Sequence, residues 1–434
     1  MTTATSTITF TADGFKAFLD ANNDPAWLRE MREKAWARFE ELEWPGQKDE
    51  EWMRTDIRLF KLDKFSMPRE HDGQMPASVF NEGVDLAGHC SSLDGIPISA
   101  ELDADLQAKG VLFGSAQQML AEHGDKLQKH FHSVLDPHFD RFSALHAAFW
   151  SSGAILFVPR GVVVEKPLHL FSAMSDGGID LGHTLVILED GAEATVLAEC
   201  RSPNVNASGM HCGGIELIVG DNAHLRYVNL QDWGQGAWHF GHQKATVGKD
   251  ATLQWTAGAL GSRLSKINQH VELVGTGANS QVNGVLFTEN KQHLSYHTLQ
   301  HHRAPHCISD FLYKAALQDD SRTVWRGMIK VDEGAQKTDG YQRNDDLLLS
   351  TSARADSIPG LEIEADDVRC THGSTSGRVD DELIFYAQSR GFTRIEAIRT
   401  IVTGFFQQVF DRVTIESVRD ALGQAIAHRV RDYE

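Results

Sequence analysis

A phrase that recurs along the middle of the chain restricts the fold more than any other feature of the sequence. It reads as an apolar residue, then Gly or Asp, then Ala, then alternating residues. Its marker position falls at residues 192, 223, 251, 278, 335 and 368. We count the step from 278 to 335 as two copies, with an atypical copy near His306. The period is then about 29 residues, and repeats of this length are typical of solenoids and propellers.

The residue types of the repeats select among these architectures. The repeats are rich in β-branched residues and Gly, which excludes helical repeats, and a propeller blade needs about 40–45 residues. Two to three short strands with their turns fit one coil of a β-helix, whose coils must stack to bury their inner faces. Runs at 154–159, 184–188 and 215–219 predict strands. We expect a mainly β fold with a β-helix core over residues 151–376; an ordinary β-sandwich is the alternative.

Helical patterns precede the repeats. Apolar residues recur at helical spacing over 27–42, 115–131 and 142–150. A stretch rich in Pro, Gly and Asp, about residues 66–100, has no assignment. We therefore expect an N-terminal, mostly helical domain over residues 1–150.

Helical patterns also follow the repeats. Asp380 or Asp381 is placed to cap a first helix that ends at Gly391, and residues 393–396 (Thr-Arg-Ile-Glu) form a capping box for a second. A third apolar pattern starts at Ile415. We expect a C-terminal helical domain over residues 377–434, packed on the end of the β-helix, on a partner, or on both.

The charge balance of the 434 residues excludes several classes of partner. The chain carries 41 Lys and Arg against 60 Asp and Glu, a formal net charge of −19 at pH 7. A chain with no surplus of cations is poorly suited to the phosphate backbone of nucleic acids or to anionic lipid. No run of 18 apolar residues is present that could span a bilayer. We expect partners that are neither nucleic acid nor membrane.

The cysteines indicate a reducing compartment. Their number is odd, their spacing is wide, and no C-x-x-C pair occurs, which argues against a disulfide framework and against a self-contained zinc or iron–sulfur site. Residues 1–6 also lack the basic and apolar regions of a secretory signal. We therefore expect a cytoplasmic protein. The five cysteines are Cys90, Cys200, Cys212, Cys307 and Cys370.

The densest group of histidines lies at His293, His297, His301, His302 and His306. The surrounding residues favour a strand, on which His293, His297 and His301 are spaced about 13 Å apart. One ion with metal–nitrogen bonds of about 2 Å cannot bridge that spacing. We interpret these residues as solvated or hydrogen-bonded strand histidines. The alternative, a histidine-based metallohydrolase, predicts tightly bound stoichiometric zinc.

Cys370 and His372 differ from the other candidates because they end the last repeat. Residues i and i+2 of a strand share one face, with Cα atoms about 6–7 Å apart. A thiolate and an imidazole form half of an iron site, and the adjacent Arg369 favours the thiolate if its side chain lies close. Two ligands cannot complete four-coordination, so a partner would have to supply the rest. The alternative is a buried structural Cys with a capping His.

Several longer stretches point to one known family. They are residues 331–350, Pro359, 361–363, 367–373, Phe385-Tyr386 and 389–391, together with 157–162 and 165–167. On these residues the chain resembles the SufB/SufD family of iron–sulfur cluster assembly proteins. The resemblance covers about residues 140–410; in the N-terminal third it is looser and lies chiefly at Glu50-Glu51-Trp52.

Within the family, the chain is more similar to SufD members than to SufB members. Residues 370–373 have the Cys-x-His-Gly pattern of SufD, and residues 349–361 lack the cluster-related Cys of SufB. The resemblance implies a right-handed parallel β-helix between two helical domains. It implies a non-enzymatic scaffold subunit, with no catalytic residue, that pairs with a SufB-like subunit through the end of the β-helix. An isolated chain with such an open edge could also form a homodimer.

The resemblance also implies the roles of particular residues. A transient iron–sulfur cluster would be held at the interface with the partner subunit, with His372 and Cys370 as its metal ligands in this chain and no cofactor bound permanently. The C-terminal helices would bind a SufC-like ATPase. The residues of that region are Phe385, Tyr386, Arg390, Gly391, Ile395 and Phe405.

A β-helical enzyme acting on polysaccharides is the alternative function, because this architecture recurs among lyases. Such enzymes need Asp, Lys and Arg along one groove on successive coils. The equivalent repeat positions here hold Glu193, His224, Thr252 and Asn279, which do not supply that pattern.

Overall fold

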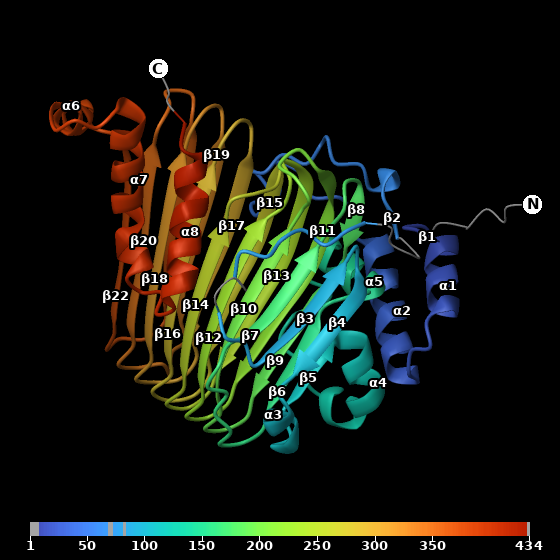
Figure 1. Ribbon diagram of the computed structural model, residues 1–434. Helices are drawn as coiled ribbons and strands as arrows, with labels where there is room; N and C mark the ends of the chain where they lie inside the picture. The colour runs from blue at the N-terminus through green and yellow to red at the C-terminus, as the bar shows by residue number, and fades with distance from the viewer. Residues whose placement is uncertain (1–7, 68–72, 81–83, 432–434) are drawn as a thin grey trace, which may run out of the picture.

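Two sheets of ten strands each dominate the computed structural model, which describes residues 8–67, 73–80 and 84–431 (Figure 1). Residues 1–6, expected to carry no secretory signal, lie outside the described residues. From β9 onward the chain alternates between the sheets, and each strand pairs in parallel with the strand two places along the sequence. This arrangement is a parallel β-helix with two strands in each coil, which confirms the expected fold class.

The first sheet, sheet I, begins with a hairpin and continues with parallel strands. Its strands, in spatial order, are β4 (Ile96–Leu102), β3 (Gly88–Leu93), β7 (Leu168–Ala173), β10 (Glu193–Arg201), β12 (His224–Asp232), β14 (Thr252–Ala259), β16 (Asn279–Thr288), β18 (Ile308–Leu317), β20 (Asp339–Leu348) and β22 (Arg369–Arg378).

Sheet II faces sheet I across the core. Its strands, in spatial order, are β5 (Leu112–Ser115), β6 (Ala154–Val158), β9 (His183–Leu188), β11 (Ser208–Val219), β13 (Gly236–Val247), β15 (Leu264–Leu273), β17 (His293–His302), β19 (Arg322–Val331) and β21 (Arg354–Ile363), with β8 (Gly178–Asp180) paired to β11.

A left-handed backbone residue at the corner of most coils explains the sequence repeat. The residue immediately before the marker has a positive φ of 52–77° at six positions, which are Gly191, Asn222, Asp250, Gly277, His306 and Lys337. Gly, Asn and Asp accept this conformation most readily. The small residue that follows is buried, as at Ala223 and Ala251.

The register corrects one marker of the repeat. Asn279, Ile308 and Asp339 are consecutive partners across sheet I, so the markers before them are Ala278, Cys307 and Thr338. The predicted marker at 335 is therefore wrong by three residues. Ala335 instead lies in the turn before β20, where an Asp-Glu-Gly-Ala sequence imitates the repeat phrase.

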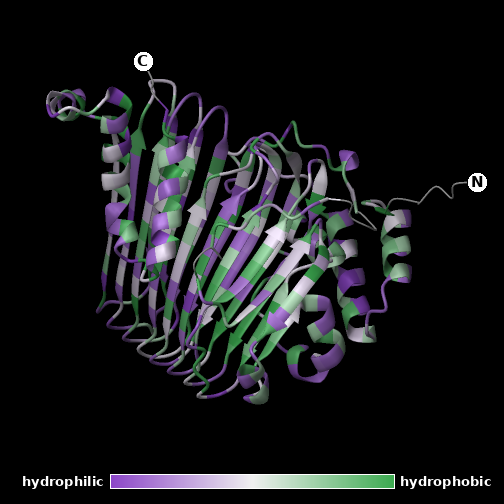
Figure 2. Ribbon diagram, in the orientation of Figure 1, coloured by the Kyte–Doolittle hydropathy of each residue, from purple (hydrophilic) through white to green (hydrophobic). Residues whose placement is uncertain are grey.

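The core lies between the sheets, where alternate residues of every strand point inward. Figure 2 shows hydrophobic and hydrophilic residues interleaved along the strands. The inward residues form one long cluster that includes Val196, Leu225, Trp255, Val282 and Phe311, each at most 1% exposed. Since each coil covers the inner face of the next, stacking buries apolar surface that no coil could bury alone.

The N-terminal region is helical in part and also extends both sheets. The helices are α1 (Ala12–Ala21), α2 (Ala26–Glu41), α3 (Ala104–Ala108), α4 (Ala116–Leu127) and α5 (Arg141–Phe149), so the three predicted helical segments are confirmed. A short antiparallel pair joins β1 (Ile8–Thr9) to β2 (Ser66–Met67). The unassigned stretch 66–100 contains β3 and most of β4, and together with β5 these strands join the sheets before residue 151.

The three C-terminal helices match the predicted ones. They are α6 (Asp381–Ser389), capped by Asp380; α7 (Arg394–Phe410), with the capping box of Thr393 and Glu396; and α8 (Glu416–Arg429). The apolar sides of α7 and α8 pack on the outer face of sheet I, whereas α6 extends past the sheet edge (Figure 1). No helix in the described part of the chain is both long enough and apolar enough to cross a membrane.

Candidate functional site

The β-helix ends at two strands that are paired on one side only. Among the described residues, β22 is the outermost strand of sheet I and β21 that of sheet II. Leu361 and Ile363 of β21 align with the fully buried Ile329 and Val331, yet they are 39% and 40% exposed. Unpaired backbone groups beside apolar side chains form an edge on which another chain can add strands.

Cys370 lies at the start of β22 and is half-buried. Its side chain packs against a small apolar cluster at the end of the core. Burial raises the pKa of the Cys370 thiol, a hydrogen bond from the backbone of Gly340 opposes this, and the Asp339 carboxylate raises the pKa further. The cluster consists of Ile329, Val331, Ala335, Ala365 and Val368.

The condition under which Arg369 would favour the thiolate of Cys370, a side chain lying close to the sulfur, is not met. The Arg369 guanidinium lies 3.8 Å from Asp339 Oδ2, and residues 369 and 370 point to opposite faces of the strand. With burial and a neighbouring carboxylate both acting against ionisation, the thiol is the resting form. A metal ion would therefore have to displace its proton.

His372 shares the inner face of β22 with Cys370 and is exposed. Its partner in the ladder is Gln342, whose amide reaches across the interior to the carbonyl of Gly360 at 3.0 Å. His372 therefore points toward the same interior side, at the open end. In the described part of the chain these two residues are not joined by a third metal-ligating side chain.

The histidines between 293 and 306 lie on a strand and its following turn, as predicted. His297 donates to Glu51 (2.6 Å), His301 donates to Asp332 (2.8 Å), and His302 is hydrogen-bonded to Ser309 (2.8 Å). His306 is a left-handed corner residue. These imidazoles do not form a metal-type cluster within the described residues, and their contacts stabilise the fold.

The candidate ATPase-binding residues fall into two groups. Phe385 and Tyr386 of α6 are 73% and 58% exposed, and the Arg390 guanidinium lies over the Tyr386 ring at 5.1 Å. Gly391 ends α6 with a φ of +96°. Ile395 and Phe405 of α7 instead pack into the cluster between the helices and sheet I.

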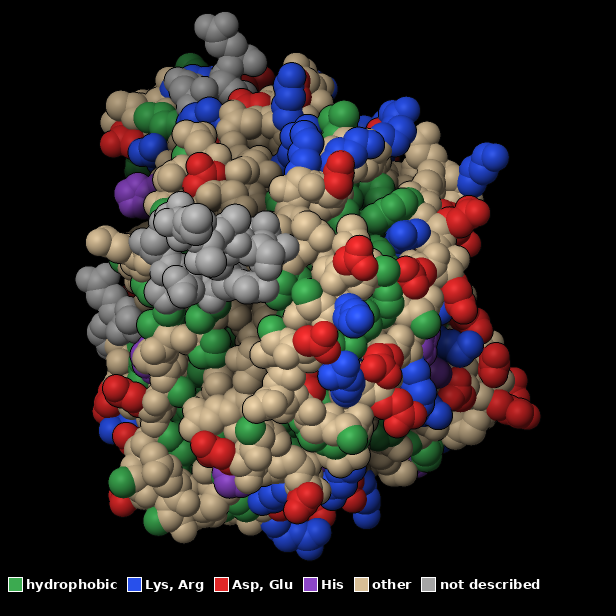
Figure 3. All heavy atoms as spheres, turned by 90° about the vertical axis from the view of Figure 1, so that its right-hand side faces the viewer, with side chains coloured by type: hydrophobic (Ala, Val, Ile, Leu, Met, Phe, Trp, Pro, Cys, Tyr) green, Lys and Arg blue, Asp and Glu red, His purple; other side chains and the backbone are tan. Residues whose placement is uncertain are grey.

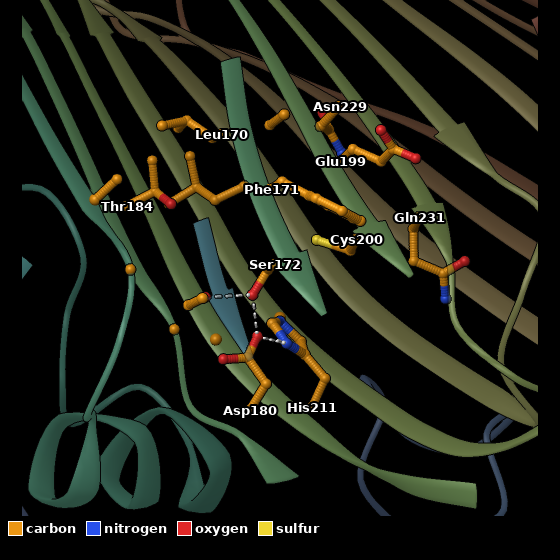
Figure 4. Close-up of a pocket in the computed structure, with 18 of the residues that line it drawn as sticks. Leu170, Phe171, Ser172, Asp180, Thr184, Glu199, Cys200, His211, Asn229 and Gln231 are labelled. Atoms are coloured by element: carbon orange, nitrogen blue, oxygen red, sulfur yellow. Dashed lines mark hydrogen bonds and ion pairs between the residues drawn. The ribbon is translucent and has the colours of Figure 1, made fainter. Parts of the chain in front are cut away.

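A small cavity inside the first coils was not foreseen from the sequence (Figure 4). It has a volume of about 90 Å³ and is lined by both sheets. The buried Asp180 carboxylate accepts hydrogen bonds from Ser152 (2.7 Å), Ser172 (2.9 Å) and His211 (2.9 Å). The thiol of Cys200 also faces this cavity, and burial raises its pKa.

These polar groups come from separate segments of the chain. The only sequence signal for them is that polar residues occupy positions that point into the core. The carboxylate has its hydrogen bonds satisfied within the network, which indicates a structural role.

The residues compared with the groove of a polysaccharide-active enzyme do occupy equivalent positions of the repeat, and they lie on sheet I. Glu193, His224, Thr252 and Asn279 are consecutive partners across four strands. The row offers one carboxylate and no cation, so it lacks the Asp, Lys and Arg groove of that class.

An open-ended parallel β-helix held between two sets of helices is the class of protein that this fold and site define. Residues 15–170 match the SufBD protein N-terminal region, and residues 171–405 match the SufBD core domain of SUF system FeS cluster assembly. The chain belongs to the SufBD family.

Curated relatives agree with this assignment. An iron–sulfur cluster assembly SufBD family protein of Mycobacterium tuberculosis is 33% identical over 300 residues, which cover 67% of this chain and 74% of the relative. Relatives with the same description from Staphylococcus epidermidis and Staphylococcus aureus are 24% and 25% identical, and each alignment covers 91% of this chain and 87% of the relative.

Proposed function

We propose that the chain is a non-catalytic, SufD-type scaffold subunit of an iron–sulfur cluster assembly complex. The observation that carries the proposal is the open end of the β-helix, where Cys370 and His372 face the side that a partner would cover. The relatives named as iron–sulfur cluster assembly proteins support the general role. On this proposal, β21 and β22 pair with the end strands of a SufB-like subunit.

The cluster is cargo that is built and released at this interface. Cys370 offers a sulfur ligand and His372 a nitrogen ligand, and both suit iron. Because this chain supplies two ligands, the SufB-like subunit completes the coordination. The raised pKa of Cys370 keeps its thiol protonated until a metal ion arrives, which limits its side reactions in the free chain.

The C-terminal helices carry the second interface of the proposal, with a SufC-like ATPase. The exposed side of α6 presents Leu383 (52% exposed), Phe385 and Tyr386. Exposed apolar side chains that cluster in this way are typical of protein interaction sites. Ile384 of α6 is buried in the cluster with α7 and sheet I, whereas the rest of α6 extends past the sheet edge, where a partner can reach it (Figure 1).

Motion at the ATPase would reach the cluster interface through α7. Arg412, just after α7, pairs with Asp310 of β18 (2.9 Å) and donates to Asn283 of β16 (3.2 Å). These strands belong to the same ladder as β22. On this proposal, a shift of the helices moves the final coils of the β-helix as one unit.

The cytoplasm is the compartment that we propose. All five cysteines are unpaired, and free thiols persist in a reducing compartment.

The test combines complex formation with cluster content. The chain is co-expressed with the SufB-like and SufC-like proteins, and iron and sulfide are measured in the purified complex. We expect a stable complex with the wild type, and loss of most of the cluster in His372→Ala and in Cys370→Ala without loss of the complex.

Ser374→Ala and His224→Ala are the matched controls. Ser374 lies on the inner face of the same strand, and His224 is exposed on β12 away from the open end. Failure of the chain to bind either protein would overturn the scaffold proposal. Full cluster content in both site variants would overturn the ligand assignment alone.

A further inference from the structure

Three histidines converge beneath the N-terminal helices, far from the open end. His132 follows α4, His146 lies on α5 and His183 on β9. One nitrogen of each ring lies within 4.8 Å of the others, and this is the one such group of His, Cys, Asp and Glu in the part of the chain that the structure describes. The ring centroids are 4.6 to 5.8 Å apart. The three imidazole side chains neither pair strands nor cap a helix, so these roles do not explain why they lie together.

Hydrogen bonds fix which nitrogens of two rings are free to bind a ligand. His183 Nε2 donates to Glu216 (3.0 Å), and His146 Nε2 donates to the carbonyl of Gly182 (3.2 Å). Each Nδ1 atom is then left with its lone pair. Histidines that bind metals commonly donate their second ring N–H to a carboxylate or a backbone carbonyl in this way.

Unpartnered nitrogens supply an independent observation. His183 Nδ1 and both ring nitrogens of His132 are buried without a hydrogen-bond partner. A buried polar atom left unpaired costs about 1–3 kcal/mol, so native structures rarely retain several together. A ligand that accepts three lone pairs at once would pair His183 Nδ1, His146 Nδ1 and one ring nitrogen of His132.

Arg32 and Glu216 are charged side chains that act on His132. The Arg32 guanidinium is paired with Asp24 at 2.8 Å, so its positive charge is partly neutralised. The buried Glu216 carboxylate supplies negative charge beside the group.

Glu216 also shapes the segment that carries His132. Its oxygens accept the backbone N–H groups of His132 (2.6 Å), Val134 (2.7 Å) and Leu135 (3.0 Å). The lack of a side chain at Gly214, beside His183 in sheet II, makes room for His146, because a Cβ there would lie 2.7 Å from its Cε1 atom. The helices, the loop and the sheet are thus all arranged around the three rings.

We propose that His132, His146 and His183 bind one divalent transition-metal ion, best suited to Zn²⁺, with Glu216 orienting His183. Imidazole nitrogens suit zinc, and three of them leave one position of a tetrahedral site for a solvent molecule. Metal–nitrogen bonds of about 2.0–2.1 Å place the nitrogens closer together than 4.8 Å, so small side-chain rotations accompany binding. The ion ties α5 and the loop after α4 to the outer face of sheet II, a structural role separate from the cluster interface.

The face of the molecule that carries the N-terminal helices has charges of both signs. Figure 3 shows the side of the molecule with the N-terminal helices, where acidic and basic side chains are interspersed and few histidines reach the surface. Of the three proposed ligands, His146 and His183 are buried and His132 is half-buried.

The test uses Co²⁺ and Zn²⁺ as probes on the full chain after treatment with a chelator. We expect one Co²⁺ per chain with the visible absorption of tetrahedral cobalt, its displacement by Zn²⁺, and a higher melting temperature with metal. His132→Gln and His183→Gln abolish the absorption, and Glu216→Gln weakens binding by roughly 10–100-fold. The control His224→Gln binds as the wild type does.

Two further measurements separate this site from the cluster ligands and check that the variants fold. The Cys370→Ala/His372→Ala variant must retain the cobalt signal, which separates this site from the cluster ligands. Circular dichroism of each metal-free variant checks folding, and the wild-type stoichiometry decides the question even if a variant does not fold. A wild-type chain that takes up no stoichiometric cobalt, or a folded His132→Gln chain that binds it unchanged, overturns the proposal.

Discussion

Glu51 connects the N-terminal region to the β-helix through one carboxylate. It accepts from His297 (2.6 Å), pairs with Arg326, and lies 3.7 Å from Lys266. Although desolvation raises the pKa of Glu51, the hydrogen bond from His297 and the nearby cations lower it to about 2. The family resemblance at residues 50–52 therefore falls on a residue that anchors the loop before β2 to β17 and β19.

We expect Glu51→Gln to lower the free energy of unfolding at pH 7 by about 1 kcal/mol, since the half-exposed carboxylate is screened by water. Because folding lowers the pKa from 4.5 to about 2, the wild type has this advantage above about pH 4.5 and loses it as the pH falls toward 2. Urea unfolding at several pH values measures the difference. The exposed Glu40→Gln serves as the control, and a pH-independent difference would contradict the prediction.

Gly284 of β16 faces Tyr313 of β18 within the core. A Cβ atom at Gly284 would lie 2.1 Å from the Tyr313 ring, and both residues are on adjacent strands in register. The Tyr313 side chain is 1% exposed and cannot move aside without disturbing its neighbours.

We expect Gly284→Ala to destabilise the chain by about 1–3 kcal/mol, because the added methyl group overpacks the core. Gly404→Ala is a control with the opposite expected sign, since Gly404 lies in α7 with open space around its Cβ position and Ala favours a helix by about 0.5–1 kcal/mol. Chemical denaturation of both variants checks the pair. Equal stability of Gly284→Ala and the wild type would show that Tyr313 can be displaced at no cost.

At the scale of the elements, the capping box of α7 lies between a mostly exposed helix and a packed one. Thr393 accepts from the N–H of Glu396 (3.3 Å), and Glu396 accepts from the N–H of Thr393 (2.7 Å). The α6 helix on one side is exposed, whereas Val402 and Phe406 of α7 are fully buried against sheet I. The box therefore marks the start of the helix that packs most extensively on sheet I.

Thr393→Ala should destabilise the first turn of α7 by about 1 kcal/mol, the usual effect of losing such a cap. Hydrogen exchange should accelerate in α6 and in the first turn of α7, while α8 stays protected. Thr414→Ala, in the exposed loop before α8, is the control. Unchanged exchange at residues 394–398 would mean that packing alone holds the helix start.

For the whole molecule, the free edges of β21 and β22 determine how isolated chains associate. We expect the purified chain to form a homodimer through these edges when no partner subunit is present. Leu361→Asp places a charge on the inner side of the edge and should raise the dimer Kd at least about tenfold. Sedimentation equilibrium measures it, with Val274→Asp, exposed in a distant turn, as the control. A wild type that stays monomeric at high concentration would contradict the prediction.

Much of this architecture could be predicted from sequence because each coil repeats one local requirement. A left-handed corner needs Gly, Asn or Asp, and a small residue must follow it, so Asn222-Ala223 and Asp250-Ala251 are visible as a repeat. Where a coil uses Lys337-Thr338 instead, the pattern fails and the nearby Ala335 misleads. Helix caps such as Thr393 are equally local and were located correctly.

The sites were less predictable because they depend on contacts between distant segments. The shared face of Cys370 and His372 follows from strand alternation, but the pairing of Arg369 with Asp339 depends on the neighbouring coil. The three converging histidines come from a loop, a helix and a strand, and no spacing in the sequence joins them. Only the folded β-helix brings such residues together.

Because the ladder register is unbroken, the number of coils fixes the distance between the two ends of the β-helix. Six strand steps separate β9, which carries His183, from β21 at the open end, so the two regions are held about 29 Å apart at ~4.8 Å per step. Adding or removing a whole coil would change that distance in steps of about 5 Å while leaving every corner and both ends intact. The length of the rod can therefore be tuned independently of the chemistry at either end.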